Sequence, residues 1–203
     1  MRKWQLVLPS LALVALCAAC EKEDEAAEHP AAAAAAGPAP GTPEWKIADA
    51  MSAAPAEIGQ GATIMDWPAS EGAQPTQLRA GTNGWTCFPD EPNSPMDDPQ
   101  CLDAQWMGWV QAYVSHGAPN PTGVGVAYML KGGQAASMTD PFKMRPDSGQ
   151  EWGTEGPHLM MIVPRSMLNT LNGIPDHPTS GGPWVMWKGT PYVHVMMPSR
   201  AGS

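Results

Sequence analysis

The sequence predicts an α+β domain with a mainly antiparallel sheet, one substantial helix and long Gly/Pro-rich loops. Its 203 residues include 21 glycines and 23 prolines, which interrupt the chain every few residues and favour short strands joined by turns. One segment, 99–115, instead carries apolar residues at helical spacing. Residues 44–198 follow an unusual N-terminal region, and their number is typical of a single domain with its own core.

The first part of this domain predicts a short helix and then a strand. In residues 43–51, Ile47, Ala50 and Met51 recur at helical spacing. Residues 62–67 follow as an apolar run that a proline ends, which is typical of a short strand.

An Asn-Gly pair predicts a hairpin in the next part of the chain. Asn83 and Gly84 lie between the segments 77–80 and 85–88. Both residue types tolerate the positive φ angles of a type I′ turn, which joins two antiparallel strands. The second strand of this predicted hairpin contains Cys87.

The strongest helix signal lies at 99–115. Asp98 and Pro99 are typical of a helix start, with the aspartate as N-cap and the proline in the first turn. A single apolar stripe at i, i+4, i+7 and i+11 consists of Leu102, Trp106, Trp109 and Tyr113. Such a stripe more often packs into a core than binds a ligand.

The second half of the domain predicts four more strands and a brief helix. The strands are 124–130, 158–163, 184–187 and 192–197. Gly189, Thr190 and Pro191 predict the turn between the last two strands, and 167–171 predicts the brief helix.

Residues 1–19 predict a cleavable secretory signal peptide. Arg2 and Lys3 form a positive head, and residues 6–16 form an apolar core that is too short to span a membrane. The two alanines before Cys20 resemble the lipobox of bacterial lipoproteins, which implies that Cys20 is lipidated and becomes the first mature residue. Two alternatives stay open, ordinary cleavage after residue 19 with secretion, and a retained anchor.

Residues 20–43 predict a disordered tether, and residues 199–203 form a short tail. The tether joins an acidic run to an Ala/Pro tract without bulky apolar residues, so it buries too little surface to become ordered.

Removal of the signal peptide leaves 9 basic against 20 acidic side chains, a net charge of −11. This charge argues against nucleic acid as a partner, and it leaves the lipid anchor as the route to a membrane.

Cys87 and Cys101 are the only cysteines of the predicted domain. Two cysteines in an exported protein most often form a disulfide, which here would join the hairpin to the first turn of the main helix. A redox-active or metal-binding pair is the alternative.

Two near-identical segments carry the clearest candidate site, 158–161 and 194–197, which share the pattern H-[LV]-M-M. On a strand, the first and third residues of each segment face the same side. If the two strands are neighbours, two imidazoles and two thioethers converge, and thioether sulfur suits Cu(I). The H-x-M unit resembles motifs of periplasmic copper chaperones of the cupredoxin-like kind. This resemblance implies a copper site formed by His158, Met160, His194 and Met196. The alternative is plain core packing, because Met is a flexible core filler.

The sequence as a whole favours binding over catalysis. It contains no G-x-S-x-G elbow, P-loop or H-E-x-x-H helix. The segments GTNGWTCFPD, AYMLKGG and GGPWVMWKGTPY resemble secreted and lipoprotein-like bacterial sequences, a resemblance that implies no activity. We expect a lipid-anchored cell-envelope protein, facing the periplasm or the exterior, that binds a small molecule, a protein or copper. The alternative is an envelope hydrolase that uses His and Asp side chains in a loop-built cleft.

Overall fold

The computed structural model describes residues 37–70 and 72–199. They belong to one compact unit, Gly37–Ser203. The predicted signal peptide, Cys20 and most of the predicted tether lie outside the described residues. Within the described part of the chain, no helix is long and apolar enough to cross a membrane.

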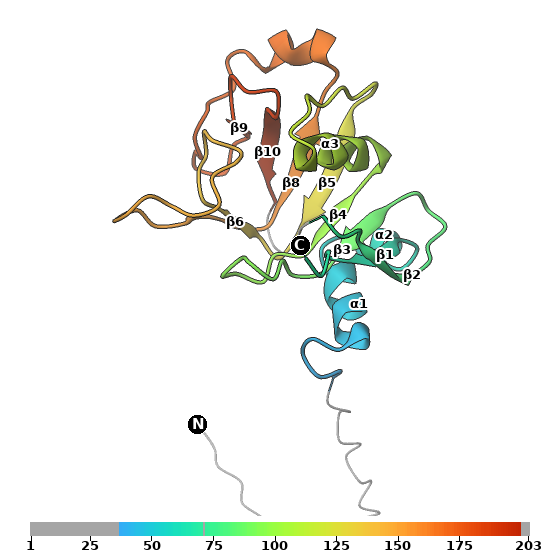
Figure 1. Ribbon diagram of the computed structural model, residues 1–203. Helices are drawn as coiled ribbons and strands as arrows, with labels where there is room; N and C mark the ends of the chain where they lie inside the picture. Colours follow the sequence, from blue (N-terminus) through green and yellow to red (C-terminus); the bar gives the residue numbers. More distant parts are fainter. Residues whose placement is uncertain (1–36, 71, 200–203) are drawn as a thin grey trace, which may run out of the picture. The chain divides into compact units, whose positions relative to one another are not determined.

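The largest element of the fold is one eight-stranded sheet with the order β2-β1-β3-β4-β5-β8-β10-β9 (Figure 1). Paired strands run antiparallel except β1 and β3, which run parallel, so the sheet is mixed. The predicted combination of strands and short helices is confirmed at this coarse level. The strands are β1 Thr63–Asp66, β2 Thr76–Arg79, β3 Thr86–Phe88, β4 Gln100–Leu102, β5 Gly125–Met129, β8 His158–Ile162, β9 Trp184–Met186 and β10 His194–Pro198.

The four strands predicted in the second half of the domain are present as β5, β8, β9 and β10. They form one side of the sheet in the order β5-β8-β10-β9, although β8 and β10 are far apart in the sequence. In β8, alternate residues are buried, which places His158 and Met160 on the same inward face. The predicted turn at 189–191 connects β9 to its antiparallel neighbour β10.

The predicted hairpin around Asn83 is wrong. The strands on either side of it, β2 and β3, do not pair with each other, because β1 lies between them and pairs with both. Asn83 instead fixes a longer connection: its Nδ2 donates to the carbonyl of Ile58 at 2.8 Å, and its Oδ1 accepts from the N–H of Trp85 at 3.1 Å. An Asn-Gly pair satisfies its turn geometry locally, and it does not determine which strand is the partner.

The main helix is shorter than predicted, and it begins five residues later. The helix α3 spans Ala104–Val114, and its N-cap is Asp103, whose side chain accepts from the N–H of Trp106 at 2.9 Å. The segment before it forms β4, because its backbone pairs with both β3 and β5. Asp98, the predicted N-cap, accepts from the N–H of Glu91 in a loop at 3.1 Å.

The predicted disulfide between Cys87 and Cys101 is confirmed. The two residues lie directly opposite each other in the antiparallel pair β3–β4, with their Cα atoms 4.0 Å apart. The bond therefore joins two adjacent strands rather than a hairpin and a helix.

Three further helices surround the sheet. The predicted first helix is confirmed as α1, Pro43–Met51, with Thr42 as its N-cap, and the single turn α2 spans Ala56–Gly59. The brief helix predicted at 167–171 is present as the 3₁₀ helix η1, Arg165–Leu171. Apolar residues of α1 and α2 pack with β1, β3 and β4 into a separate small core around the disulfide.

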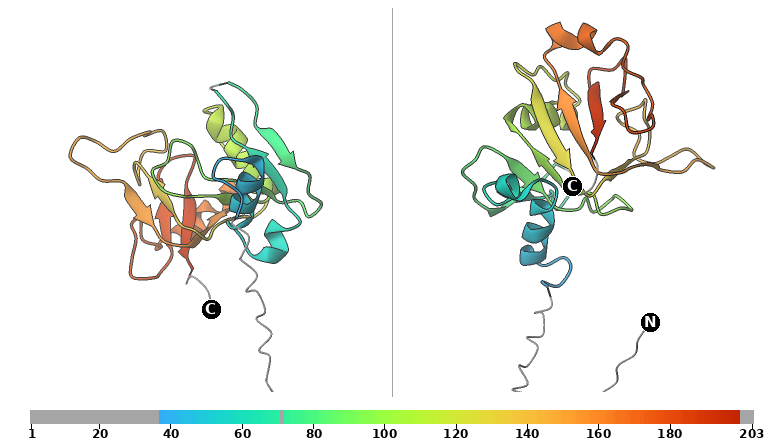
Figure 2. Two further views of the ribbon diagram at one scale, coloured as in Figure 1. Left: turned by 90° about the horizontal axis from the view of Figure 1, so that it is seen from below. Right: turned by 180° about the vertical axis from the view of Figure 1, so that it is seen from behind.

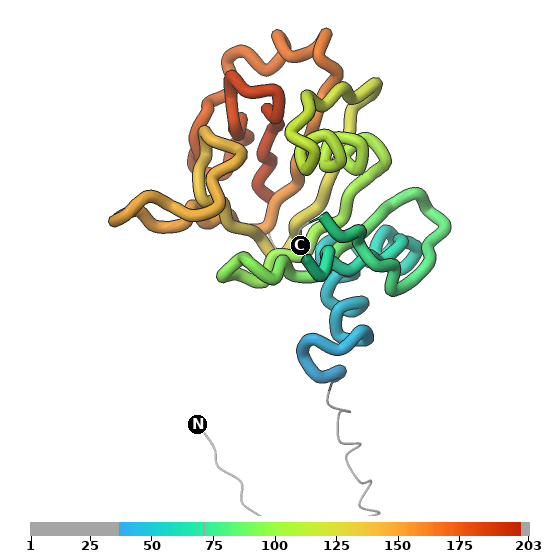
Figure 3. Tube along the Cα trace, viewed as in Figure 1, coloured from blue at the N-terminus to red at the C-terminus, as the bar shows by residue number. Residues whose placement is uncertain are grey.

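A two-stranded ribbon that the sequence analysis missed lies beside the main sheet. Its strands are β6, Gly133–Ala135, and β7, Gly153–Glu155, and they run antiparallel. Figure 3 traces the long connection between them, residues 136–152, away from the eight-stranded sheet. The ribbon carries Gln134 and Glu155 to a cavity of about 370 Å³.

The main core lies between α3 and one face of the sheet. Trp106 and Trp109 of α3 are buried against Met160, Met186 and Met196 of the sheet. In the view from behind (Figure 2), β5, β8 and β10 lie side by side, with α3 on the far side of them. The predicted apolar face of α3 thus packs into the core. The same face lines a cavity between α3 and the sheet.

Candidate functional site

The two His-x-Met segments lie on adjacent strands, β8 and β10, which run antiparallel. Met160 and Met196 are direct cross-strand partners. Because residues two apart on a strand share a face, all four predicted residues point to the same side of the sheet. They line one cavity of about 370 Å³ between α3, the sheet and the β6–β7 ribbon.

The register of the two strands places the histidines at opposite ends of the methionine pair. His158 lies opposite Pro198, which is four residues beyond His194 on β10. At about 3.3 Å per residue, this offset amounts to about 13 Å along the strands. The two imidazoles therefore face the cavity from opposite ends.

Each histidine instead has another methionine as its nearest partner across the sheet. His158 pairs with Met129 on β5, and His194 pairs with Met186 on β9. The sequence analysis assigned no role to either methionine, because each becomes a neighbour only through the strand order. The thioethers that line the cavity belong to Met129, Met144, Met160, Met186 and Met196.

Both imidazoles have a defined hydrogen-bonding pattern. The Nδ1 atom of His158 lies 2.8 Å from the carbonyl of Gly156, and that of His194 lies 3.0 Å from the carbonyl of Tyr192. A carbonyl only accepts, so Nδ1 carries the proton in each neutral ring and Nε2 carries the lone pair. The Nε2 atom of His158 is buried and has no hydrogen-bond partner among the described residues.

Burial keeps both imidazoles neutral. It lowers the pKa of His194 to about 4; the hydrogen bond to Tyr192 opposes this shift, and the charge of nearby His158 contributes to it. Burial also lowers the pKa of His158, although the hydrogen bond to Gly156 opposes this shift. Near pH 7 both rings therefore present an uncharged Nε2 atom, the form that binds metal ions.

Glu155 of β7 is the carboxyl group next to His158. The distance from its Oε2 to the Nε2 of His158 is 3.7 Å, which is too long for a hydrogen bond. Its Oε1 is buried and also lacks a partner within the described residues. Burial raises the pKa of Glu155 to about 7. The buried Nε2 atom of His158 and the buried Oε1 atom of Glu155 thus both lack a hydrogen-bond partner within the described residues.

The end of the cavity around His194 is aromatic. The rings of Trp106, Trp109 and Trp187 meet the imidazole edge-on, with centroid distances of 5.5, 5.8 and 5.0 Å. Trp187 has a positive φ of 51°, which is uncommon for a bulky residue. Its N–H donates to the carbonyl of Met138 at 3.0 Å, and its Nε1 donates to that of Ser137 at 2.9 Å. The connection between β6 and β7 therefore holds this ring in place.

The charged groups of the cavity lining are all acidic. Glu91, Asp98 and Glu155 supply carboxyl groups, and none of the described lining residues is lysine or arginine. Across the described residues, no group of three or more His, Cys, Asp and Glu side chains has the arrangement of a metal site. Any metal ion in this cavity would therefore depend on thioether ligands.

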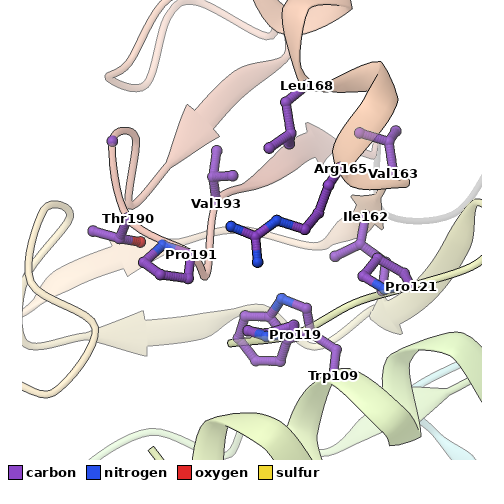
Figure 4. A pocket seen from close by; sticks show the side chains of 11 residues that line it. Trp109, Pro119, Pro121, Ile162, Val163, Arg165, Leu168, Thr190, Pro191 and Val193 are labelled. Atoms are coloured by element: carbon purple, nitrogen blue, oxygen red, sulfur yellow. The ribbon is translucent and has the colours of Figure 1, made fainter. Parts of the chain in front are cut away.

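A smaller cavity of about 230 Å³ lies on the other side of Trp109 (Figure 4). Arg165 extends into it between apolar side chains, which include Pro119 and Val193. Arg165 is the only charged side chain among its described lining residues. None of the four predicted site residues lines this cavity.

Comparison of the chain with protein-family models, with curated proteins and with solved structures finds no match.

Proposed function

We propose that the domain is a non-enzymatic binding domain for a soft metal ion, Cu(I), and that the ion occupies the cavity between α3 and the sheet. The observation that carries this proposal is the Nε2 atom of His158, which is buried without a partner among the described residues, in a cavity lined by five methionines. Imidazole nitrogen and thioether sulfur are both copper ligands, and thioethers favour the Cu(I) state.

Two further features of the cavity support a metal cation as the ligand. The described lining contains three carboxyl groups and no lysine or arginine, which favours a positive ligand over an anion. The Nδ1–H group of each histidine donates to a backbone carbonyl, and metal-ligating histidines commonly make this contact, which fixes the ring and its tautomer.

A competition titration tests the proposal. The full chain, purified in detergent, is titrated with Cu(I) kept reduced by ascorbate in the presence of a chromophoric chelator. We expect one ion per chain, and we expect the variant M160L/M196L to bind at least about tenfold more weakly. The matched control is M161L/M197L, because these residues lie on the same two strands and alternate with the cavity face. A wild-type protein that takes no copper from the chelator would contradict the proposal.

The proposal also includes export. Under it, the chain is anchored in the bacterial cell envelope through lipid on Cys20, and the domain faces the periplasm or the exterior. The support comes from the sequence, namely the positive head, the short apolar core and the two alanines before the cysteine. Ordinary secretion after cleavage at residue 19 is the alternative.

Acid–base catalysis is a second candidate function, and the pair His158–Glu155 is the observation that favours it. A buried carboxyl group with a pKa near 7 beside a neutral imidazole is a common arrangement in hydrolases. No serine, threonine or cysteine occurs among the described lining residues, so the nucleophile would be water. Hydrolysis of an ester or amide panel that E155Q abolishes would establish this function.

A further inference from the structure

We infer that the metal ion is held at one end of the cavity by Met129, His158 and Met160, and that His194 is not a ligand. This inference rests on the proposed function, because it names the ligands of the same cavity. It replaces the symmetric arrangement of two His-x-Met units with a site built from two neighbouring strands, β5 and β8.

The strand register brings the three donor side chains together. Met129 lies directly opposite His158 in the antiparallel pair β5–β8, where the Cβ atoms of direct partners are about 5 Å apart. Met160 follows His158 by two residues on the same face of β8. Three side chains that each carry one donor atom therefore occupy adjacent positions on one face of the sheet.

The backbone of Gly133 confirms that two of these side chains pack at a common point. A Cβ atom on Gly133 would lie 2.8 Å from Cε of Met129, and 3.7 Å both from its Sδ and from Cε1 of His158. The thioether of Met129 and the imidazole edge of His158 therefore both lie next to the backbone of Gly133. Glycine at this position of β6 leaves room for them.

Unpaired buried atoms show where a cation would be stabilised. The side chain of His158 is 3% exposed, and its Nε2 lacks a partner among the described residues, as does Oε1 of Glu155. A cation bound to Nε2 of His158 would satisfy this atom, and its charge would be offset by the carboxylate of Glu155.

The other end of the cavity lacks this combination. The Cα atom of His194 is offset by about 13 Å along the strands from that of His158, so His194 is not adjacent to His158 and Met129 in the sheet. No acidic side chain forms an ion pair with it in the described structure, and three tryptophan rings meet its edges. Met186 lies opposite His194 as Met129 lies opposite His158, so the two methionines form a matched pair for an experiment.

The test compares M129L with M186L in the same Cu(I) competition, again with the full chain in detergent. We expect M129L to weaken binding by at least about tenfold and M186L to leave it within about twofold of wild type. If M186L weakens binding as much as M129L, or if M129L has no effect, the inferred ligand set is wrong while the proposed function stands. If wild type binds no copper, the proposed function fails, and the inference fails with it.

A measurement on the wild-type protein removes the dependence on how the variants fold. The methyl groups of ¹³C-methyl-labelled methionine are followed by NMR during titration with Cu(I). We expect the resonances of Met129 and Met160 to shift at one equivalent, while that of Met186 stays in place. A shift confined to Met186 and Met196 would overturn the inference.

Discussion

Burial shifts the pKa values of two cavity residues, Glu155 and His194, in opposite directions. The pKa of Glu155 rises to about 7, so the folded protein holds a proton there that the unfolded chain releases above its ordinary pKa of 4.5. The pKa of His194 falls to about 4, so the folded protein lacks a proton there that the unfolded chain holds below 6.5. Between pH 4.5 and 6.5 the two contributions to the free energy of unfolding have opposite slopes and offset each other.

Replacement of Glu155 by Gln separates these contributions. The contribution of Glu155 to stability is full below pH 4.5, and it is lost as the pH rises through about 7. By linkage this loss amounts to about 3 kcal/mol. The metal-free E155Q variant should therefore gain stability relative to wild type as the pH rises from 4.5 to 8. Urea unfolding of both proteins across this range measures the difference, and a difference that does not change with pH would contradict the assignment.

At the residue scale, the sequence revealed part of the candidate site. The repeated H-x-M pattern identified four residues that line one cavity, because the period of a strand places alternate residues on one face. Met129, Met186 and Glu155 lie on strands whose neighbours follow from the strand order and register. No local pattern contains this information, so the sequence analysis did not find them.

At the element scale, strand pairing explains two of the differences from the sequence predictions. Residues 100–102 follow a proline, and Leu102 is the first residue of the apolar stripe, so local signals favour a helix there. These residues instead pair with strands on both sides and form β4. Asn83 and Gly84 occupy a turn whose two flanking strands each pair with β1. Local signals located α1, β5, β8, β9 and β10, whereas they gave no indication of the β6–β7 ribbon.

The disulfide stabilises two adjacent central strands, β3 and β4. Its loop closes over a sequence separation of 14 residues. The chain-entropy relation for a loop of this length gives a stabilisation of about 3 kcal/mol. The double variant C87A/C101A should therefore unfold at a lower urea concentration than wild type. Chemical unfolding measures this difference, and alkylation of the unreduced, denatured wild-type protein should label neither cysteine. Labelling of both would contradict the bond.

At the scale of the whole molecule, the proposal that the chain is exported and lipid-anchored rests on the sequence of its N-terminal region. We expect the exported protein to partition with membranes and to carry an acyl mass increment on Cys20. The C20A variant should lose the increment and either accumulate as precursor or appear in the soluble fraction. Intact-mass analysis after expression in a bacterium measures this, and an unmodified mature chain that begins at Cys20 would contradict lipidation.

The mixed topology of the sheet also belongs to this scale. The Gly and Pro content favours short strands, and it does not determine their directions. β1 and β3 are parallel because β2 lies on one side of β1 and the chain then returns to place β3 on the other side. The same topology brings β5 and β8 together with α3 above them, and this arrangement forms the cavity.

The claim that this cavity is a soft-metal site has one direct test. Crystals of the Cu(I)-loaded protein are measured on both sides of the copper absorption edge, and an anomalous difference map locates the ion. We predict a single peak about 2 Å from Nε2 of His158, a typical metal–imidazole bond length, with Met129 and Met160 as its sulfur neighbours. A peak at His194, or no peak in the cavity of a copper-saturated crystal, would contradict the account.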